Sequence, residues 1–418
     1  MSATSTDDLA RERRSFRRLW MSVAASNLGD GLTRALAPLL AASITRDSVL
    51  VAGILVAQYL PWLLFTLISG VVVDRLDRRR LLMIGNAVRT VALGLLAVAL
   101  FIGHLPLLLL YAVVFAVGVA ETIVDNASAS MLPSIVRRDR LDWANGRVVA
   151  TRTISDDLAG PAAAGVLFTL SASLAVVTGS AAYLAAAAAA LLITHIAPSG
   201  ERTHSRATRS VAADLRAGIS YFWSDRLMRE LAAQAAVFNF AGGAVGGILV
   251  LALTGPMGLT PMQLGFFLAF TALGGLVAGL TAQRVISRLG RGTILLLGAL
   301  VATVGYTTVA LTFDPVLSAG ALLLAAATMT YGQVVTVTQR QATIPGHLLG
   351  RVTSTFRLIG LGVVPFGALA GGILAQHFGL ASVFVAAAAV NAANAVFIVL
   401  RLTNARLRLP TNAAAIRG

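Results

Sequence analysis

Long uninterrupted runs of apolar residues alternate along this chain with short polar stretches. Residues 49–73 and 172–194, for example, contain no charged side chain. A helix needs about 20 apolar residues to cross a membrane, and these runs lack the apolar–polar alternation of barrel strands. The pattern predicts an all-α polytopic membrane protein with about twelve spans, at 17–43, 48–73, 81–103, 106–132, 147–170, 173–196, 231–253, 262–284, 293–312, 316–338, 352–376 and 380–402.

The predicted spans fall into two sets of six. We expect an N-terminal arm (1–16), a first six-helix bundle (17–197), a polar linker (198–230), a second bundle (231–402) and a C-terminal tail (403–418). Because the spans are even in number, both termini should lie on the same side of the membrane.

The linker shows helical periodicity in its second part. Val211, Leu215, Ile219 and Phe222 fall on one face of a helix. Such a face is typical of an amphipathic helix lying along a membrane surface, although a solvated linker helix would show the same spacing.

Composition supports membrane insertion. The chain is 57% hydrophobic and only 12% charged, whereas soluble domains carry about 25% charged residues. The net charge of +15 would suggest nucleic-acid binding in a soluble protein, but every basic residue other than histidine is an arginine, and the arginines gather in alternate loops and at both ends. This positive-inside pattern instead predicts a bacterial cytoplasmic membrane protein with both termini cytoplasmic and no nucleic-acid partner.

Cysteine is absent, so the sequence excludes disulfides and thiolate metal sites. No cleavage-site pattern follows the first span, which we therefore expect to be retained. We predict no metal, no cofactor and no enzymatic activity, because nucleotide-binding loops, His-Glu metal motifs and nucleophile elbows are missing. The expected partners are membrane lipid, protons and a small-molecule substrate, with the chain acting as a monomer.

The two halves repeat each other weakly. The matched residues are Asn27, Gly31, Gly70, Arg75, Arg79, Gly146, Arg147 and Pro161 in the first half, and Asn239, Gly243, Gly279, Arg284, Arg288, Gly350, Arg351 and Pro365 in the second. Parallel repeats of this kind are found in transporters whose substrate site lies between the halves, near the middle of the bilayer.

A charged loop follows the second predicted span. It resembles the signature loop of the major facilitator superfamily, G-x-x-x-D-R-x-G-R-R, and departs from it at Asp77, where the family usually has glycine. The matching residues are Gly70, Asp74, Arg75, Arg78 and Arg79. The resemblance implies a latch on the cytoplasmic side, with the region around Gly350 and Arg351 as its partner. Glycine at position 70 would let two helices approach closely.

A second resemblance concerns the fifth span. Gly160, Pro161 and Gly165 resemble in part the antiporter motif G-P-x-x-G-G of the same superfamily. Segments 16–20 with 26–30, 132–147 and 350–352 are similar to its branch of macrolide-efflux and enterobactin-exporter-like proteins. The arginine-bearing motif that many drug antiporters have in the fourth span is replaced here by Glu121, Asp125 and Asn126, so a mechanism based on that arginine does not carry over.

Charged residues inside the spans are candidates for function, and Asp30, Glu121, Asp125 and Asp156 are the predicted proton-coupling residues. Each costs about 2.5–3.5 kcal/mol to insert and is functional by default. The acids are Asp30, Glu121, Asp125, Asp156 and Asp157, and the basic residues are Arg34 and Arg152.

Helical spacing pairs these charges locally. Asp30 with Arg34, and Arg152 with Asp156, are four residues apart and share a face. Burial disfavours the charged form of a carboxyl group, so Glu121 or Asp30 could carry a proton. The alternative is that the pairs are static. Arg89 and Arg357 are expected to extend toward the membrane surface, and Tyr183 is expected to be scaffold.

The remaining polar and aromatic residues of the spans suit a mostly apolar substrate cavity. The predicted cavity residues are Arg34, Gln58, Tyr59, Trp62, Asn239, Phe266, Tyr331, Gln333 and Asn391.

Three functions fit these features. The first is proton-coupled export of small lipophilic compounds by alternating access. The second is export of a siderophore or another anionic metabolite, with Arg34, Arg152 and Arg357 lining the pocket. The third is a membrane receptor without transport, although the polar loops are short for a ligand domain.

Overall fold

The computed structural model of the chain describes residues 6–137, 140–193 and 219–407, and the regular elements it assigns there are all helices. They divide between two compact units. As far as they are described, unit 1 is built from residues 1–46, 57–204 and 259–269, and unit 2 from residues 47–56, 205–258 and 270–418. The units differ from the two predicted six-helix sets in the short segments 47–56 and 259–269, which pack with the opposite half of the sequence.

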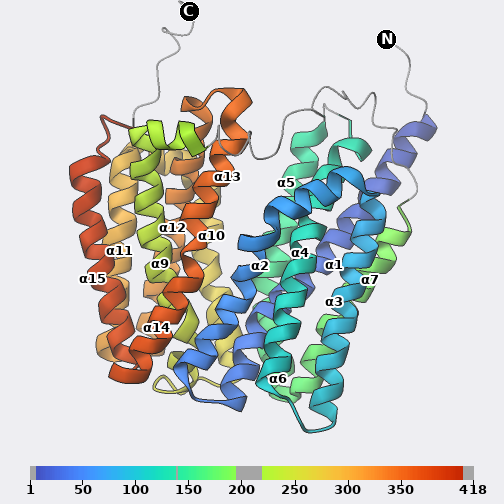
Figure 1. Cartoon of the computed structure of the whole chain (residues 1–418), viewed down its shortest axis with the longest axis horizontal. Coiled ribbons are helices and arrows are strands. Elements are labelled where there is room, and N and C mark those ends of the chain that lie inside the picture. Colours follow the sequence, from blue (N-terminus) through green and yellow to red (C-terminus); the bar gives the residue numbers. More distant parts are fainter. Residues whose placement is uncertain (1–5, 138–139, 194–218, 408–418) are drawn as a thin grey trace, which may run out of the picture. The chain divides into compact units, whose positions relative to one another are not determined.

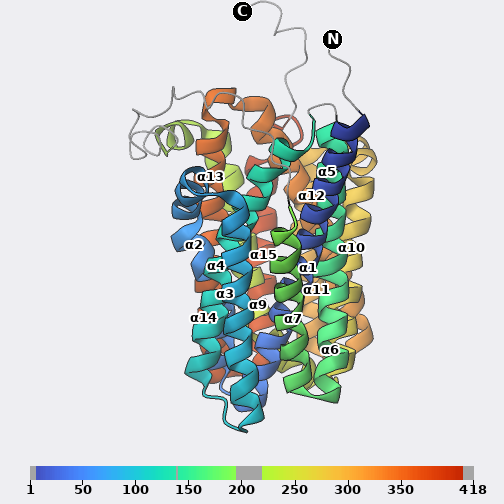
Figure 2. The same cartoon turned by 90° about the vertical axis from the view of Figure 1, so that its right-hand side faces the viewer.

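Most of unit 1 comes from the first half of the sequence, coloured blue to green in Figure 1. Its helices are α1 (Thr6–Ile44), α2 (Ser48–Arg75), α3 (Arg78–Phe101), α4 (Leu107–Ile135), α5 (Leu141–Arg152), the π-helical segment η2 (Thr153–Ala159), α6 (Gly160–Leu170) and α7 (Ala172–Leu191). Helix α7 packs along both α1 and α3, and α4 packs along α3 (Figure 2).

Unit 2 takes most of its helices from the second half of the sequence. They are α9 (Arg226–Thr254), α10 (Pro261–Leu289), α11 (Arg291–Thr312), α12 (Pro315–Thr343), α13 (Gly346–Gly362), α14 (Val364–Phe378) and α15 (Leu380–Arg401). Helix α9 packs against α14 and α15, while α11 packs against α12 and α15.

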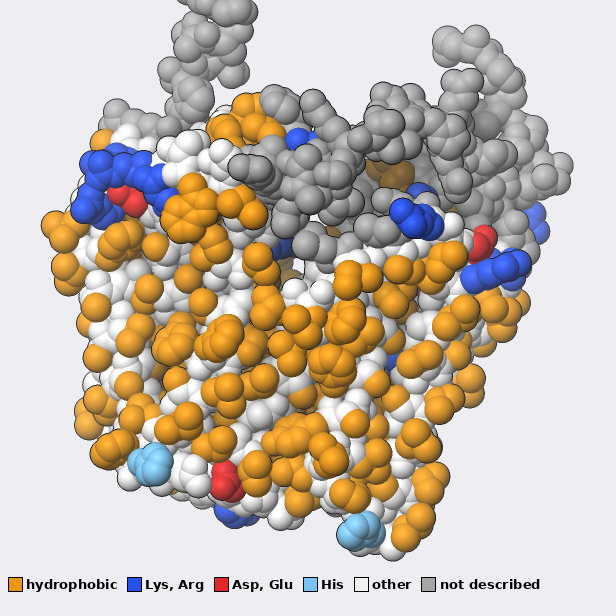
Figure 3. All heavy atoms as spheres, viewed as in Figure 1, with side chains coloured by type: hydrophobic (Ala, Val, Ile, Leu, Met, Phe, Trp, Pro, Cys, Tyr) orange, Lys and Arg blue, Asp and Glu red, His pale blue; other side chains and the backbone are white. Residues whose placement is uncertain are grey.

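The predicted spans agree with the observed helices. Each of the twelve coincides with a helical stretch, and within the described residues ten helices are long and apolar enough to cross a membrane. The two other helical stretches are α1 and the run α5–η2–α6, which carry the predicted coupling residues Asp30 and Asp156 together with Arg34 and Arg152. Figure 3 shows hydrophobic side chains over most of the visible surface of the helices, with charged side chains near the helix ends. The all-α membrane fold is confirmed.

The fifth span departs from the prediction in its backbone. Residues 153–159 form a π-helix, which ends with the Gly160 amide donating to the Ser155 carbonyl. Pro161 follows immediately and has no N–H, so it cannot make the α-helical bond to the carbonyl of residue 157. The wider π turn accommodates that missing donor, and such turns are frequent at functional sites.

The predicted amphipathic linker lies partly outside the described residues, which exclude Val211 and Leu215. Residues 219–224 are helical. There Phe222 is only 2% exposed and packs in the same hydrophobic cluster as Met228 and Leu231 of α9. This part of the linker is therefore anchored in the core of unit 2.

Glycines allow two very close helix crossings in unit 1. A Cβ on Gly160 would lie 2.6 Å from the backbone of Gly31, and one on Gly31 would meet the backbone of Asp156. Gly165 and Gly265 also face each other, with 2.9 Å from a Cβ on Gly165 to the Gly265 Cα. Side chains cannot fit between backbones this close, so the crossings require glycine.

Candidate functional site

A cluster of charged side chains lies where α1, α4 and η2 of unit 1 meet. The Arg34 guanidinium donates to Asp156 Oδ2 at 2.5 Å and to Glu121 Oε1 at 3.0 Å. Arg152 approaches Asp125 Oδ2 at 3.6 Å and Asp156 Oδ2 at 3.8 Å. These five residues, Arg34, Glu121, Asp125, Arg152 and Asp156, are called the open cluster below.

The cluster is called open because its two arginine side chains are exposed. The Arg34 and Arg152 side chains are 41% and 50% exposed, whereas those of Glu121 and Asp156 are 11% and 1% exposed. Tyr59 of α2, a predicted cavity residue, lies within electrostatic range of Arg34, Glu121 and Asp156. Asp157, the neighbour of Asp156, is exposed. Guanidinium groups with accessible surface therefore cover carboxylates that are largely buried.

Asp30 belongs to a different cluster, so the expected local pair with Arg34 is wrong. Its carboxylate lies 3.3 Å from Arg89 Nη1 and accepts a hydrogen bond of 2.8 Å from the Tyr183 hydroxyl. Arg89 also donates to the Ser26 hydroxyl at 2.8 Å. Asp30, Arg89, Tyr183 and Ser26 are called the closed cluster.

The closed cluster is sealed from solvent. Arg89 and Tyr183 are fully buried and Asp30 is 3% exposed. Arg89 therefore does not extend to the membrane surface as predicted, and its guanidinium stacks over the Tyr183 ring at 5.0 Å. Tyr183 does stabilise the scaffold, but through a specific polar contact. A buried charge is tolerated only when it is paired and hydrogen-bonded in this way.

The helix crossings position Asp156. The backbone of Asp156 lies against Gly31, one turn before Arg34 on α1. Because the π segment is held there by backbone contact, the Asp156 carboxylate reaches an arginine of another helix as well as Arg152 of its own. The predicted pair of Arg152 and Asp156 is present, but at 3.8 Å it is the longer of the two contacts.

The sequence located these acids but missed most of their partners. Arg89 and Tyr183 gave a weak signal, since each is a polar residue in the middle of an apolar run. The contact between Arg152 and Asp125 joins two helices and had no signal in the local spacing.

The predicted cavity residues are distributed over both units. Gln58, Tyr59, Trp62 and Phe266 belong to unit 1, and Asn239, Tyr331, Gln333 and Asn391 to unit 2. Three of them make local contacts instead of facing open space. Asn239 donates to the Gly360 carbonyl at 2.8 Å, the Tyr331 and Thr281 hydroxyls lie 2.8 Å apart, and Asn391 is fully buried and donates to the Ala387 carbonyl at 2.9 Å.

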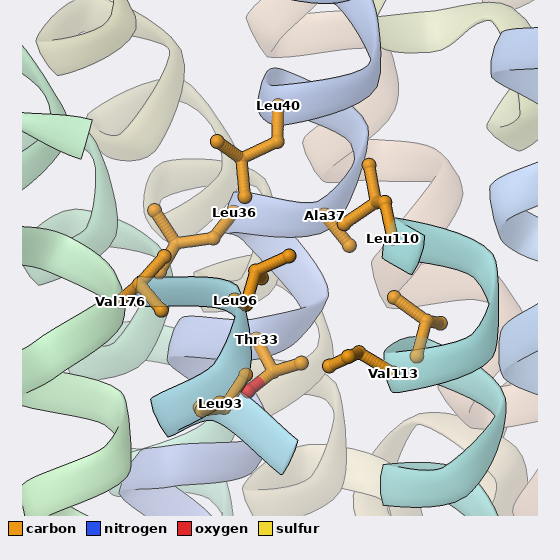
Figure 4. A pocket seen from close by; sticks show the side chains of 10 residues that line it. Thr33, Leu36, Ala37, Leu40, Leu93, Leu96, Leu110, Val113 and Val176 are labelled. Carbon is orange, nitrogen blue, oxygen red and sulfur yellow. The ribbon is translucent and has the colours of Figure 1, made fainter. Parts of the chain in front are cut away.

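A small apolar hollow lies within unit 1 beside the closed cluster. Figure 4 shows its lining, in which Thr33 is the polar member among leucine, valine and alanine side chains. Its volume of about 10 Å³ is no more than the space of one water molecule. The hollow is a gap in the core and cannot hold a substrate.

The residues of the signature loop hold helix ends together within unit 1. Arg78 donates to the Ser130 carbonyl at 2.7 Å, and Arg79 donates to the carbonyls of Ala190 and Leu191 in the last turn of α7. Cations are favourable at helix C-termini, where carbonyls are unpaired. The side chain of Asp74 lies outside the described part of the chain, and Arg75 is exposed.

Two further features of this loop differ from the expectation. Asp77 caps α3, because its carboxylate accepts the Arg80 amide at 2.8 Å, which gives the departure from the family pattern a structural role. Gly70 does not mediate a close helix approach, since a Cβ there would meet nothing within 4 Å.

Long apolar helices with ion pairs enclosed among them define a multi-pass membrane protein of the transporter type. A family model described as transmembrane secretion effector matches residues 9–414. The chain therefore belongs to this family, which lies in an efflux branch of the major facilitator superfamily, and the resemblance seen in the sequence is confirmed.

Relatives in mycobacteria support the same branch. The multidrug efflux pump Tap of Mycolicibacterium fortuitum is 27% identical over 381 residues, which cover 86% of this chain and 88% of Tap. The Tap pump of Mycobacterium tuberculosis strain H37Rv is 28% identical over 357 residues, covering 79% and 80%. The relatives are transporters, which implies a function other than catalysis.

Solved structures show the same fold. A mutant of the nucleoside transporter NupG matches with a TM-score of 0.75 at 12% identity, over 94% of this chain and all of that one. A bacterial homologue of the iron transporter ferroportin, in an inward-facing state, matches with a TM-score of 0.70 at 16% identity, over 95% and 99%. At these identities the likeness concerns the fold alone.

Proposed function

We propose that this chain is a proton-coupled exporter of small lipophilic compounds that works by alternating access in the bacterial cytoplasmic membrane, with both termini in the cytoplasm. The open cluster is the proposed coupling site. The relatives described as multidrug efflux pumps support the substrate class.

One observation carries the coupling proposal. The open cluster contains three carboxyl groups, Glu121, Asp125 and Asp156, and only two guanidinium groups, Arg34 and Arg152. These five groups, counted without the exposed neighbour Asp157, are electrically balanced when one carboxyl group holds a proton. Because uncompensated charge is costly in a membrane, the binding and release of that proton changes the energy of the whole cluster.

Glu121 is the favoured proton carrier. Glu121 and Asp125 each contact one guanidinium group, that of Arg34 or that of Arg152, whereas Asp156 contacts two. Of the first two, Glu121 is the more buried, with its side chain 11% exposed against 26% for Asp125. A carboxyl group held by two cations gives up its negative charge less readily. Asp30 is disfavoured because it is buried in the closed cluster with its partners in place.

Transport by the reconstituted protein tests this proposal. In liposomes with an imposed pH gradient, we expect wild-type protein to move a lipophilic dye against its concentration gradient. Glu121→Gln should lose the response to the pH gradient and retain downhill exchange of the dye. Glu230→Gln is the matched control, because Glu230 also pairs with arginines, namely Arg226, Arg401 and Arg406 of unit 2. Full gradient-driven transport by Glu121→Gln would rule out the assignment.

Exposure of the two arginines favours a second candidate, the export of an anionic metabolite. Arg34 and Arg152 are the most exposed members of the open cluster, and guanidinium groups bind carboxylates and phosphates well. In that case Arg34→Gln should abolish binding of an anionic substrate, while Glu121→Gln should leave transport intact.

A further inference from the structure

Arg340 is a buried cation in unit 2 that has no carboxylate. It lies in the last turn of α12 and is only 6% exposed. Its Nε and Nη1 atoms are buried, and no described residue accepts a hydrogen bond from them. Arg89 of unit 1, the other deeply buried arginine among the described residues, has Asp30 as its counterion. Arg340 therefore has an unmet requirement for an anion.

The acids of unit 2 that the structure describes do not meet this requirement. Its described carboxyl groups are those of Asp47, Asp225, Glu230 and Asp314. Asp47, Asp225 and Asp314 accept backbone amides at helix N-termini, and Glu230 pairs with three arginines at the start of α9 and after α15. No described carboxyl group of unit 2 is therefore available to Arg340, and a bound anion would supply the missing partner.

The surroundings of Arg340 resemble a recognition site. Its guanidinium lies over the Phe356 ring of α13, with 4.1 Å from Cζ to the ring centre. The next residue on α13, Arg357, is exposed and close enough to interact electrostatically with Arg340. Two arginines that repel each other beside an aromatic ring are stabilised by an oxyanion bound to both.

The position along the helices indicates which oxyanion this is. Arg340 is three residues from the end of a candidate span, Pro315–Thr343, a depth at which lipid headgroups lie. Leu358 and Leu361 of α13 are 50% and 46% exposed and follow Arg357 directly along the helix. Apolar side chains beside paired cations suit a molecule that has an anionic head and an apolar tail.

We infer that Arg340, Arg357 and Phe356 form a binding site for the phosphate headgroup of an anionic phospholipid. The exposed Arg357 meets the headgroup first, and Arg340 then pairs with it as the headgroup enters beside Phe356. The acyl chains lie along the exposed leucines of α13. Basic pockets at helix ends bind anionic headgroups in this manner.

Lipid binding to the purified full-length protein tests the inference. In detergent, we expect phosphatidylglycerol to raise the thermal unfolding temperature of wild-type protein more than phosphatidylcholine does. Arg340→Gln and Arg357→Gln should each weaken binding of phosphatidylglycerol at least about tenfold, since each removes charge-assisted hydrogen bonds. Arg288→Gln is the control, because Arg288 is an exposed arginine in the last turn of another helix, α10.

Other results of the lipid-binding experiment would contradict the inference. If inorganic phosphate alone gives the same stabilisation, the site binds an oxyanion from solution and the lipid assignment is wrong. Equal effects of both lipids on wild-type protein, or binding that survives both substitutions, would overturn the inference. If the Arg340→Gln variant does not fold, the Arg357→Gln variant tests the lipid site instead, because Arg357 is exposed. The measured quantity is lipid binding, so a result that overturns the lipid site does not affect the coupling proposal.

Discussion

At the scale of single residues, unit 1 contains two charge clusters with opposite surroundings. In the closed cluster, Asp30 is surrounded by donors and sealed from solvent. In the open cluster, the Arg34 and Arg152 side chains are exposed while the carboxyl groups they contact are largely buried. The closed cluster therefore suits a structural role, and the open cluster suits one in which charge changes during transport.

Removal of the Tyr183 hydroxyl tests the structural role. Tyr183→Phe leaves Asp30 buried with one donor fewer, so we expect it to lower the free energy of unfolding by about 1–3 kcal/mol. Thermal unfolding in detergent measures the effect. Tyr306→Phe is the control, because Tyr306 is also buried and no described residue forms a hydrogen bond with its hydroxyl. Equal stabilities of the two variants would contradict the assigned role of Tyr183.

At the scale of helices, the crossing of α1 with η2 and α6 determines the geometry of the open cluster. Gly31 and Gly160 bring the two backbones together, and the π turn before Pro161 forms at the same place. A π turn displaces the residues that precede it relative to an α-helix. The direction of the Asp156 side chain thus depends on the backbone as much as on its own rotamer.

Substitution of Gly31 by alanine, which adds one methyl group, tests the crossing of α1 with η2 and α6. The Cβ of Gly31→Ala would lie 2.9 Å from the Asp156 Cα, and a backbone atom cannot move aside as a side chain can. We expect a loss of about 1–3 kcal/mol in stability, together with weakened transport. Gly94→Ala on α3 is the control, since a Cβ there meets nothing within 4 Å. It should be neutral or stabilising by up to about 1 kcal/mol, and both effects can be followed by thermal unfolding.

At the scale of the whole molecule, the charges influence how the chain occupies the membrane. In the described chain, α1 and the run α5–η2–α6 are the two predicted spans outside the ten apolar candidates, and they supply most members of the two clusters. A charge inside a span costs about 2.5–3.5 kcal/mol when it is unpaired. These two stretches are therefore stabilised in the membrane by partners on other helices.

The absence of cysteine allows the membrane topology to be measured directly. Single substitutions Arg80→Cys and Arg288→Cys lie at arginine-rich ends, whereas His104→Cys and His377→Cys lie at the opposite ends of their helices. We expect a membrane-impermeant thiol reagent to label the first pair only from the cytoplasmic side and the second pair only from outside. Labelling of both pairs from one side would contradict the proposed topology.

The sequence by itself determined the helices, their approximate ends, the superfamily and the acids that lie inside the membrane. These features are local, since a run of about 20 apolar residues must span the bilayer whatever surrounds it. The signature loop was likewise readable from Gly70 to Arg79, although the lack of a close approach at Gly70 was not.

Only the tertiary structure decided which charges meet. Spacing along one helix suggested Asp30 with Arg34, yet Arg34 pairs with Glu121 and Asp156, and Asp30 pairs with Arg89. The missing counterion of Arg340 also became visible only in three dimensions. The physical reason is that a charge in an apolar medium takes the partner that packing places nearest, and packing depends on helices that are far apart in the sequence.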